Sequence, residues 1–353
     1  MNISILIPTK DRADFILRLL KYYSISNFRG SLLICDSSNS KLFEVNKSNI
    51  DKFKNKIDIE YYHKPKLDMF KAISYLCNRV KTDYSALVCD DDLILTDCMQ
   101  VSINFLDQNK DYSAVHGKAL LMGIEDGQCK ANGKITSLIE YPVANIKHSK
   151  PIDRVESFFN DALNLNMAIT RSEINTEAFL QMSHIDSYNA SYIFGEMLHA
   201  SIICARGKIG KVDEYGLLRQ FHAEQYFHQI KIIDWMSRPD WRDVYTFLKI
   251  VITREVRASE GSSSKSIDDG VSDILSRWVR KMLSSIGDNN KSISNSIYIR
   301  LVSYFKNIKF LKLLVRYIMF FLVKNRKNII HDAFIHKGVA IYLDIVKEKN
   351  QNK

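Results

Sequence analysis

The sequence has few of the features that mark secreted, zinc-binding or membrane-spanning proteins. Its six cysteines include no Cys-x-x-Cys pair and their spacing fits no zinc motif, so we expect buried free thiols in a reducing compartment. The N-terminus has no basic segment followed by an apolar stretch, so no secretory signal is predicted. The longest uncharged apolar run near the C-terminus, Tyr317–Val323, is far shorter than the roughly 20 residues of a spanning helix. These absences predict a cytoplasmic protein.

Signatures for binding phosphates and nucleic acids are also missing. The segment Ile7–Arg12 (IPTKDR) has no glycine-rich loop of the kind that cradles phosphates. This disfavours a nucleotidyltransferase, although that alternative stays open. No helix-turn-helix, zinc-finger or RNA-binding signature is present, so no nucleic-acid partner is predicted.

Acidic residues are scarce in the C-terminal third. The net charge is +10 over 353 residues, but residues 231–353 hold 23 basic and 12 acidic side chains, while residues 1–230 are nearly neutral. Residues 289–331 contain nine Lys or Arg and no acid, with an apolar stripe at helical spacing. This pattern predicts a helix that contacts an anionic membrane surface, at the inner face of the plasma membrane, or a helix packed in a small C-terminal bundle, and the two are compatible.

Short apolar segments of strand length alternate with amphipathic segments of helical spacing. This alternation predicts an α/β fold with a mostly parallel sheet, helices on both of its faces and a helical C-terminal region. The expected strands are Ile3–Pro8, Ser31–Cys35, Ile57–Tyr62, Ser85–Cys89, Lys208–Val212 and Tyr215–Phe221. The expected helices are Asp11–Tyr23, Met69–Val80, Arg154–Leu163 and Ser191–Arg206, with mostly helix beyond residue 230 and a polar loop at Ala258–Asp269.

Polar clusters follow three of the expected strands, at Thr9–Arg12, Asp36–Ser38 and Asp90–Asp92. Ligands of parallel sheets bind at the carboxyl ends of the strands, so the three clusters are predicted to share one site. Three adjacent carboxylates repel one another, and Mn²⁺ or Mg²⁺ would relieve the repulsion while substrate phosphates complete the metal's ligand shell. The alternative is that Asp91 or Asp92 caps a following helix.

These segments together resemble a known enzyme family. ISILIPTKDR, LLICDSS and ALVCDDDLIL, in this order, resemble the N-terminal half of inverting family 2 glycosyltransferases with the GT-A (Rossmann-like) fold. The third segment corresponds to their DxD-type motif. SYIFGEMLHASIICARGKIGKV and EYGLLRQFHAEQ resemble the family's catalytic helix and closing strand, so the likeness covers roughly residues 1–230. The chain would then divide into a GT-A domain, 1–230, and a basic helical region, 231–353.

The resemblance implies a metal-dependent transfer of a sugar from a nucleotide-sugar to a hydroxyl group. The acceptor would be a glycan or a lipid-linked molecule, as in the assembly of bacterial surface polysaccharide, lipopolysaccharide or capsule. Asp92 and His222 would hold Mn²⁺ or Mg²⁺, and Glu196 would be the general base. Within the donor site, Asp36 would contact the nucleobase and Asp90 the ribose. The implied donor-binding residues are Pro8, Thr9, Arg12, Asp36, Ser37, Ser38, Lys64, Lys66, Asp90 and Asp91.

One departure from the family pattern concerns the base. Met197 stands where the family commonly has an aspartate, so Asp186 and Glu224 are alternatives to Glu196, and inversion of configuration is an open question. Met197 also keeps open a catalytically inactive, membrane-associated protein that binds a nucleotide-sugar or glycan. Structural roles stay open as well: a surface charge for Glu196, a buried histidine for His222, and loop charges for Lys64 and Lys66.

Overall fold

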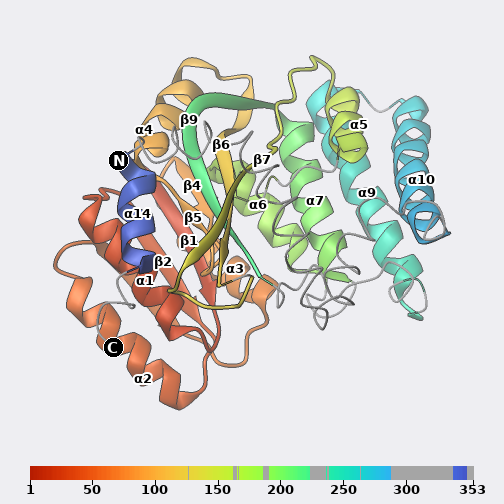
Figure 1. The fold of residues 1–353 in the computed structure, drawn as a ribbon. Helices are drawn as coiled ribbons and strands as arrows, with labels where there is room; N and C mark the ends of the chain where they lie inside the picture. Colours follow the sequence, from red (N-terminus) through yellow and green to blue (C-terminus); the bar gives the residue numbers. More distant parts are fainter. Residues whose placement is uncertain are drawn as a thin grey trace, which may run out of the picture.

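Figure 1 shows the computed structural model of the chain. The structure describes residues 1–125, 127–161, 165, 167–185, 191–222, 236, 238–262, 264–287 and 337–347. The predicted basic stretch 289–331, the alternative bases Asp186 and Glu224, and the predicted domain boundary at residue 230 lie outside the described residues.

A nine-stranded mixed sheet forms the centre of the molecule. Its order is β3-β2-β1-β4-β8-β6-β9-β5, with β7 paired to β6. Pairing is parallel from β3 to β4 and between β6 and β9, whereas β8, β5 and β7 pair antiparallel with their neighbours. The strands are β1 (Ile3–Thr9), β2 (Ser31–Asp36), β3 (Asp58–His63), β4 (Tyr84–Leu87), β5 (Leu93–Ile94), β6 (Tyr112–Ile124), β7 (Ile135–Tyr141), β8 (Ile169–Arg171) and β9 (Lys208–Phe221).

Helices cover both faces of this sheet, which confirms the predicted fold class. On one face lie α1 (Ala13–Ile25), α2 (Ser40–Phe53), α4 (Thr96–Gln108) and α14 (Lys337–Lys347). On the other lie α3 (Met69–Cys77), α5 (Pro151–Asp161), α6 (Ser172–Met182), α7 (Ser191–Arg206), α9 (Trp241–Glu260) and α10 (Lys265–Gly287).

The sequence of β1 shows why the sheet is buried on both sides. Ile3, Ile5 and Ile7 pack into the core cluster that contains α1, while Leu6 packs into the opposite cluster that contains α3. Because neither face meets water, the strand is buried at every position and is mostly apolar instead of alternating between apolar and polar residues.

Most expected boundaries differ from the structure by a few residues, and two differ in kind. The two strands expected between residues 208 and 221 are one strand, β9, whose register against β6 shifts at three points. The loop expected at Ala258–Asp269 is mostly helical, because α9 continues to Glu260 and α10 begins at Lys265. Gly261 ends α9 with a φ of 64°, a left-handed conformation that glycine adopts at little cost.

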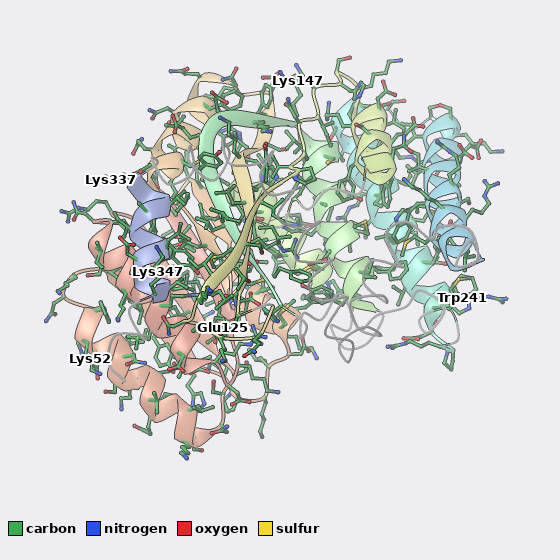
Figure 2. All side chains as sticks on the ribbon, viewed as in Figure 1. Lys52, Glu125, Lys147, Trp241, Lys337 and Lys347 are labelled. Carbon is green, nitrogen blue, oxygen red and sulfur yellow. The ribbon has the colours of Figure 1, made fainter. Side chains whose placement is uncertain are left out.

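The C-terminal helices join the cores formed by the first 222 residues. Leu248 of α9 and Trp278 of α10 belong to the same apolar cluster as α5 and α7. The helix α14, whose ends Lys337 and Lys347 are labelled in Figure 2, packs beside α1. The division into two domains therefore stays a prediction. Within the described ranges, no helix combines the length and the apolar composition needed to cross a membrane.

Candidate active site

The carboxyl ends of β1, β2 and β4 meet at one edge of the sheet. Thr9 lies in register with Asp36, and the backbone N–H of Val88 donates to the carbonyl of Leu6, so the chain after β4 stays beside β1. Parallel pairing thus brings the three polar clusters to the same edge.

The three aspartates occupy a tight turn after β4. The backbone N–H of Asp92 donates to the carbonyl of Cys89 at 3.0 Å, and Asp90, Asp91 and Asp92 are all buried. The turn leads into β5, and the next helix, α4, has Leu95 at its N-cap position with no side-chain cap. The helix-capping interpretation of Asp91 and Asp92 is therefore wrong.

Residues at the end of β1 and just after it bind two of these carboxylates. The Thr9 hydroxyl donates to Asp90 Oδ2 at 2.7 Å. Arg12 Nη1 lies 3.0 Å from Asp90 Oδ1 and 3.0 Å from Asp91 Oδ2. The preceding residue in the predicted set, Pro8, is buried at the end of β1. The guanidinium of Arg12, from the polar cluster after β1, therefore pairs with carboxylates of the cluster after β4.

His222, more than 100 residues later in the chain, also contacts the carboxylate cluster. It is fully buried directly after β9, and its Nε2 lies 2.8 Å from Asp91 Oδ2. The thiol of Cys129 lies 3.9 Å from the same His222 nitrogen and 3.8 Å from Arg12 Nη2. In this arrangement His222 contacts Asp91, not the predicted metal ligand Asp92.

A buried arginine on α1 holds the turn from behind. Arg18 is 1% exposed and donates to the Asp91 carbonyl at 2.8 Å, to the Ala131 carbonyl at 2.8 Å and to Gln220 Oε1 at 2.7 Å. The Gln220 backbone N–H in turn donates to Asp92 Oδ1 at 2.9 Å. Neither Arg18 nor Gln220 was predicted. Arg18 lies outside any motif, and its only available signal was a charge inside the apolar pattern of α1, whereas Gln220 lies in the segment that resembles the family's closing strand.

The pKa values of the carboxylates reflect burial and mutual repulsion. Burial and the neighbouring charge of Asp91 raise the pKa of Asp90 to about 6 and that of Asp92 to about 8. Burial also raises the pKa of Asp91, but the hydrogen bond from His222 and the charge of Arg12 outweigh it and leave the pKa below its usual range. The turn therefore favours a proton or another cation near Asp92.

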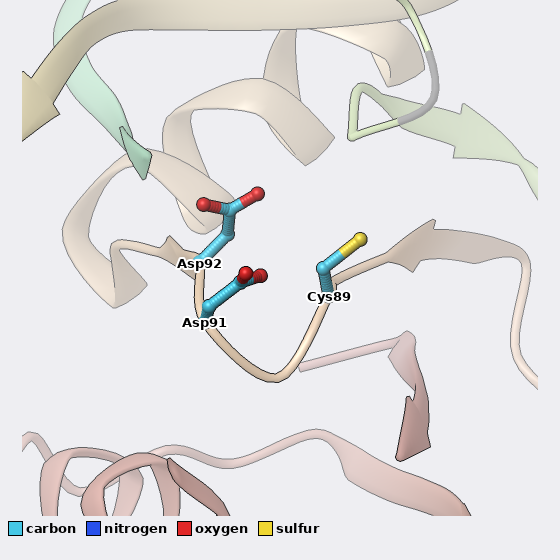
Figure 3. Close-up of side chains that lie close together, drawn as sticks. All are labelled: Cys89, Asp91 and Asp92. Carbon is cyan, nitrogen blue, oxygen red and sulfur yellow. The ribbon is translucent and has the colours of Figure 1, made fainter. Parts of the chain in front are cut away.

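The donor set at this turn suits a divalent cation. Cys89, Asp91 and Asp92 each offer a ligand atom, and the three atoms lie within 4.8 Å of one another (Figure 3). Carboxylate oxygens suit Mn²⁺ and Mg²⁺, and the thiol adds a softer ligand. Asp92 was a predicted ligand, whereas Cys89 was expected to be a buried apolar thiol. Its position directly before the aspartates was the signal that could have identified it.

The second cluster forms a rigid turn after β2. Asp36 is fully buried, and its carboxylate accepts hydrogen bonds from the Ser38 backbone N–H at 2.7 Å, from Asn46 Nδ2 at 2.8 Å and from the Tyr61 hydroxyl. Ser37 and Ser38 are buried in the same turn. Asp36 therefore fixes the local backbone, and its contact with a nucleobase stays a prediction.

Aromatic rings and lysines border this turn. The ring of Phe43 on α2 stacks on His63 at the end of β3, with ring centres 4.0 Å apart. Lys64 lies with Nζ 4.8 Å from the ring centre of Tyr75, and Lys66 is exposed in the loop before α3. The stacked pair was not predicted, because no helix was expected over the residues of α2.

Glu196 lies on α7 and is half-buried. Burial raises the pKa of Tyr192, one turn earlier on α7, and the charges of Glu196 and Cys89 and a hydrogen bond with Glu196 raise it further. Charges on Glu196 and on the turn after β4 therefore both act on the Tyr192 hydroxyl. Met197 packs against the apolar core of the helical face.

Comparison with known proteins shows a shared fold at low sequence identity. No protein-family profile matches the chain, and no curated protein matches it in sequence. Among solved structures, S. aureus TarS 1–349 in complex with UDP-GlcNAc is 12% identical with a TM-score of 0.54, over 85% of this chain and 76% of that one. The UDP complex of TarS 1–349 is 12% identical with a TM-score of 0.51, over 100% and 92% of the two chains. These similarities show the fold.

Proposed function

We propose that this chain is a metal-dependent glycosyltransferase that uses a nucleotide-sugar donor. The observation that carries the proposal is the buried carboxylate turn at the carboxyl end of β4, in a fold also adopted by a protein that binds UDP-GlcNAc and UDP. The family 2-like motifs across residues 3–95 support the same assignment. UDP-GlcNAc and UDP are accordingly the first ligands to test.

The donor would lie across the carboxyl ends of the parallel strands. Arg12 and Thr9 hold Asp90 in place for the ribose, and the turn after β2 supplies the nucleobase end of the site with Lys64 nearby. A divalent cation held by Asp92 would offset the charge that develops on the departing diphosphate. Arg219 on β9 supplies a further positive charge close to Asp92.

Glu196 is the proposed general base. Glu196 lies on α7 and interacts with Tyr192, whose pKa is also raised by the charge of Cys89. This shared neighbour supports a position for Glu196 on the same side of the sheet edge as the carboxylate turn. A carboxylate within hydrogen-bond reach of the acceptor hydroxyl would accept its proton as the sugar is transferred. A direct transfer of this kind inverts the configuration at the anomeric carbon.

The acceptor and its location belong to the same proposal. A hydroxyl of a glycan or a lipid-linked precursor of surface polysaccharide is the proposed acceptor. The basic stretch 289–331 would bring the enzyme to an anionic membrane surface, where such acceptors are presented.

A donor assay tests the proposal. The full chain is incubated with Mn²⁺ and each of a panel of nucleotide-sugars, beginning with UDP-GlcNAc, and release of the nucleoside diphosphate is measured. We expect release that EDTA abolishes and that Asp92→Asn removes, while Asp344→Asn, an exposed change of the same charge, retains it. Donor binding by thermal shift without any release would instead favour the inactive binding protein that Met197 suggests.

A further inference from the structure

Cys89 differs from most cysteines of this chain in its surroundings. Cys35, Cys77, Cys98 and Cys204 are buried, whereas Cys89 is partly exposed at the carboxyl end of β4. It opens the turn that Asp92 closes, because the Asp92 N–H donates to the Cys89 carbonyl at 3.0 Å. A turn of this kind brings its first and fourth residues close together. The thiol is therefore placed beside the carboxylates by the backbone itself.

We infer that Cys89 is a metal ligand, and that it makes this site selective for divalent transition-metal ions over Mg²⁺. Its sulfur and one oxygen each from Asp91 and Asp92 lie within 4.8 Å of one another. Figure 3 shows the three side chains rising from the inner side of the same turn. The role of the metal in sugar transfer rests on the proposed function, whereas the ligand set rests on this geometry alone.

The selectivity follows from ligand chemistry. Mg²⁺ prefers hard oxygen ligands in a near-ideal octahedron, whereas thiolate suits softer ions such as Zn²⁺ and Co²⁺. On binding, the sulfur forms a bond to the cation and the thiol proton leaves to solvent. A site of two carboxylates and one thiolate therefore ranks Zn²⁺, Co²⁺ and Mn²⁺ ahead of Mg²⁺.

Cobalt spectroscopy on the full chain, without nucleotide, tests the ligand directly. Co²⁺ titration of the wild-type protein should produce a sulfur-to-cobalt charge-transfer band in the near ultraviolet. Cys89→Ser should remove the band and weaken Co²⁺ binding by at least about tenfold, the loss that even outer-shell substitutions cause. Cys129→Ser is the matched control, because Cys129 is also partly exposed and lies near Asp91 through His222, and it should keep the band. Absence of the band in wild type, or its loss only with Cys129→Ser, would overturn the inference.

A second measurement uses the wild-type chain and does not depend on a variant that folds. Iodoacetamide labelling, quantified by peptide mass spectrometry, should modify Cys89 in EDTA, and Zn²⁺ should protect it while Mg²⁺ does not. Equal labelling with Zn²⁺ and with EDTA would contradict ligation by Cys89. The proposed function can fail separately: a cobalt–thiolate band without sugar transfer leaves the ligand in place, and transfer supported by Mg²⁺ as well as by Mn²⁺ refutes the selectivity alone.

Discussion

Replacing Asp92 by asparagine should stabilise the metal-free protein while it removes activity. Asp92 is 3% exposed, and burial together with the charge of Asp91 raises its pKa to about 8. A buried carboxylate that repels its neighbours opposes folding. Asparagine keeps an oxygen that can accept the hydrogen bond from the Gln220 backbone N–H, and it has no charge.

The size of the effect follows from the pKa. A carboxyl whose pKa rises from about 3.9 in the unfolded chain to about 8 in the folded one destabilises the fold above pH 8 by at most about 6 kcal/mol. Asp90 and Asp91 titrate together with Asp92, so one substitution recovers only part of this, about 1–3 kcal/mol. Because the folded-state pKa is the higher one, wild-type stability from this group falls as pH rises from about 4 to about 8. The variant should lack that fall.

Thermal unfolding in EDTA at pH 4 and at pH 8 measures the difference. At pH 8 the melting temperature of Asp92→Asn should exceed that of wild type by about 2–6 °C, and near pH 4 the two should agree. Mn²⁺ should raise the melting temperature of wild type and have less effect on the variant. The control is Asp344→Asn, an exposed acidic residue of α14. A variant less stable than wild type at pH 8 in EDTA would refute the electrostatic reasoning.

Three further substitutions test the supports of the site. Arg18→Met leaves three buried acceptors without their donor, so urea unfolding should show a loss of about 3–5 kcal/mol, against less than about 0.5 for the exposed control Arg280→Met. Glu196→Gln should lower sugar transfer on the order of 100-fold and leave donor binding by thermal shift intact; near-normal transfer would place the base elsewhere. Tyr61→Phe removes one donor to Asp36, and we expect a stability loss of about 1–3 kcal/mol with weaker UDP binding by calorimetry, whereas an unchanged melting temperature would contradict the bracing of this turn.

The part of the fold that could be predicted is the N-terminal half of the sheet, where each short segment of sequence indicates its own structure. The strands β1, β2 and β4 are short, mostly apolar runs followed by polar residues, and parallel pairing of such strands brings their ends together. Thr9, Arg12 and Asp90 were therefore predicted as neighbours from sequence, and the structure brings them into hydrogen-bond contact. The order of these segments along the chain was sufficient for this prediction, because β1 to β4 are neighbours in the sheet and no later segment separates them.

The rest depends on contacts between distant segments. The long pairing of β6 with β9 joins residues about 100 positions apart, and it places His222 and Gln220 at the aspartate turn. The stack of Phe43 on His63 joins α2 to the next strand, β3, and was missed because no helix was expected there. The family resemblance implied His222 at the metal, but its contact with Asp91 and the hydrogen bond from Gln220 to Asp92 were found only in the structure.

The helix α14 shows how such distant contacts reach the site. The ring of Tyr342 lies 5.3 Å from the guanidinium carbon of Arg18, and the Val346 carbonyl accepts from the Gly133 backbone N–H. Arg18 in turn holds the carbonyl of Asp91. The last described helix therefore packs on the arginine that braces the aspartate turn, although no residue of α14 belongs to the proposed site. Because that turn gathers three buried carboxylates that repel one another, the fold needs a fixed cation behind it, and α14 shields that cation from water.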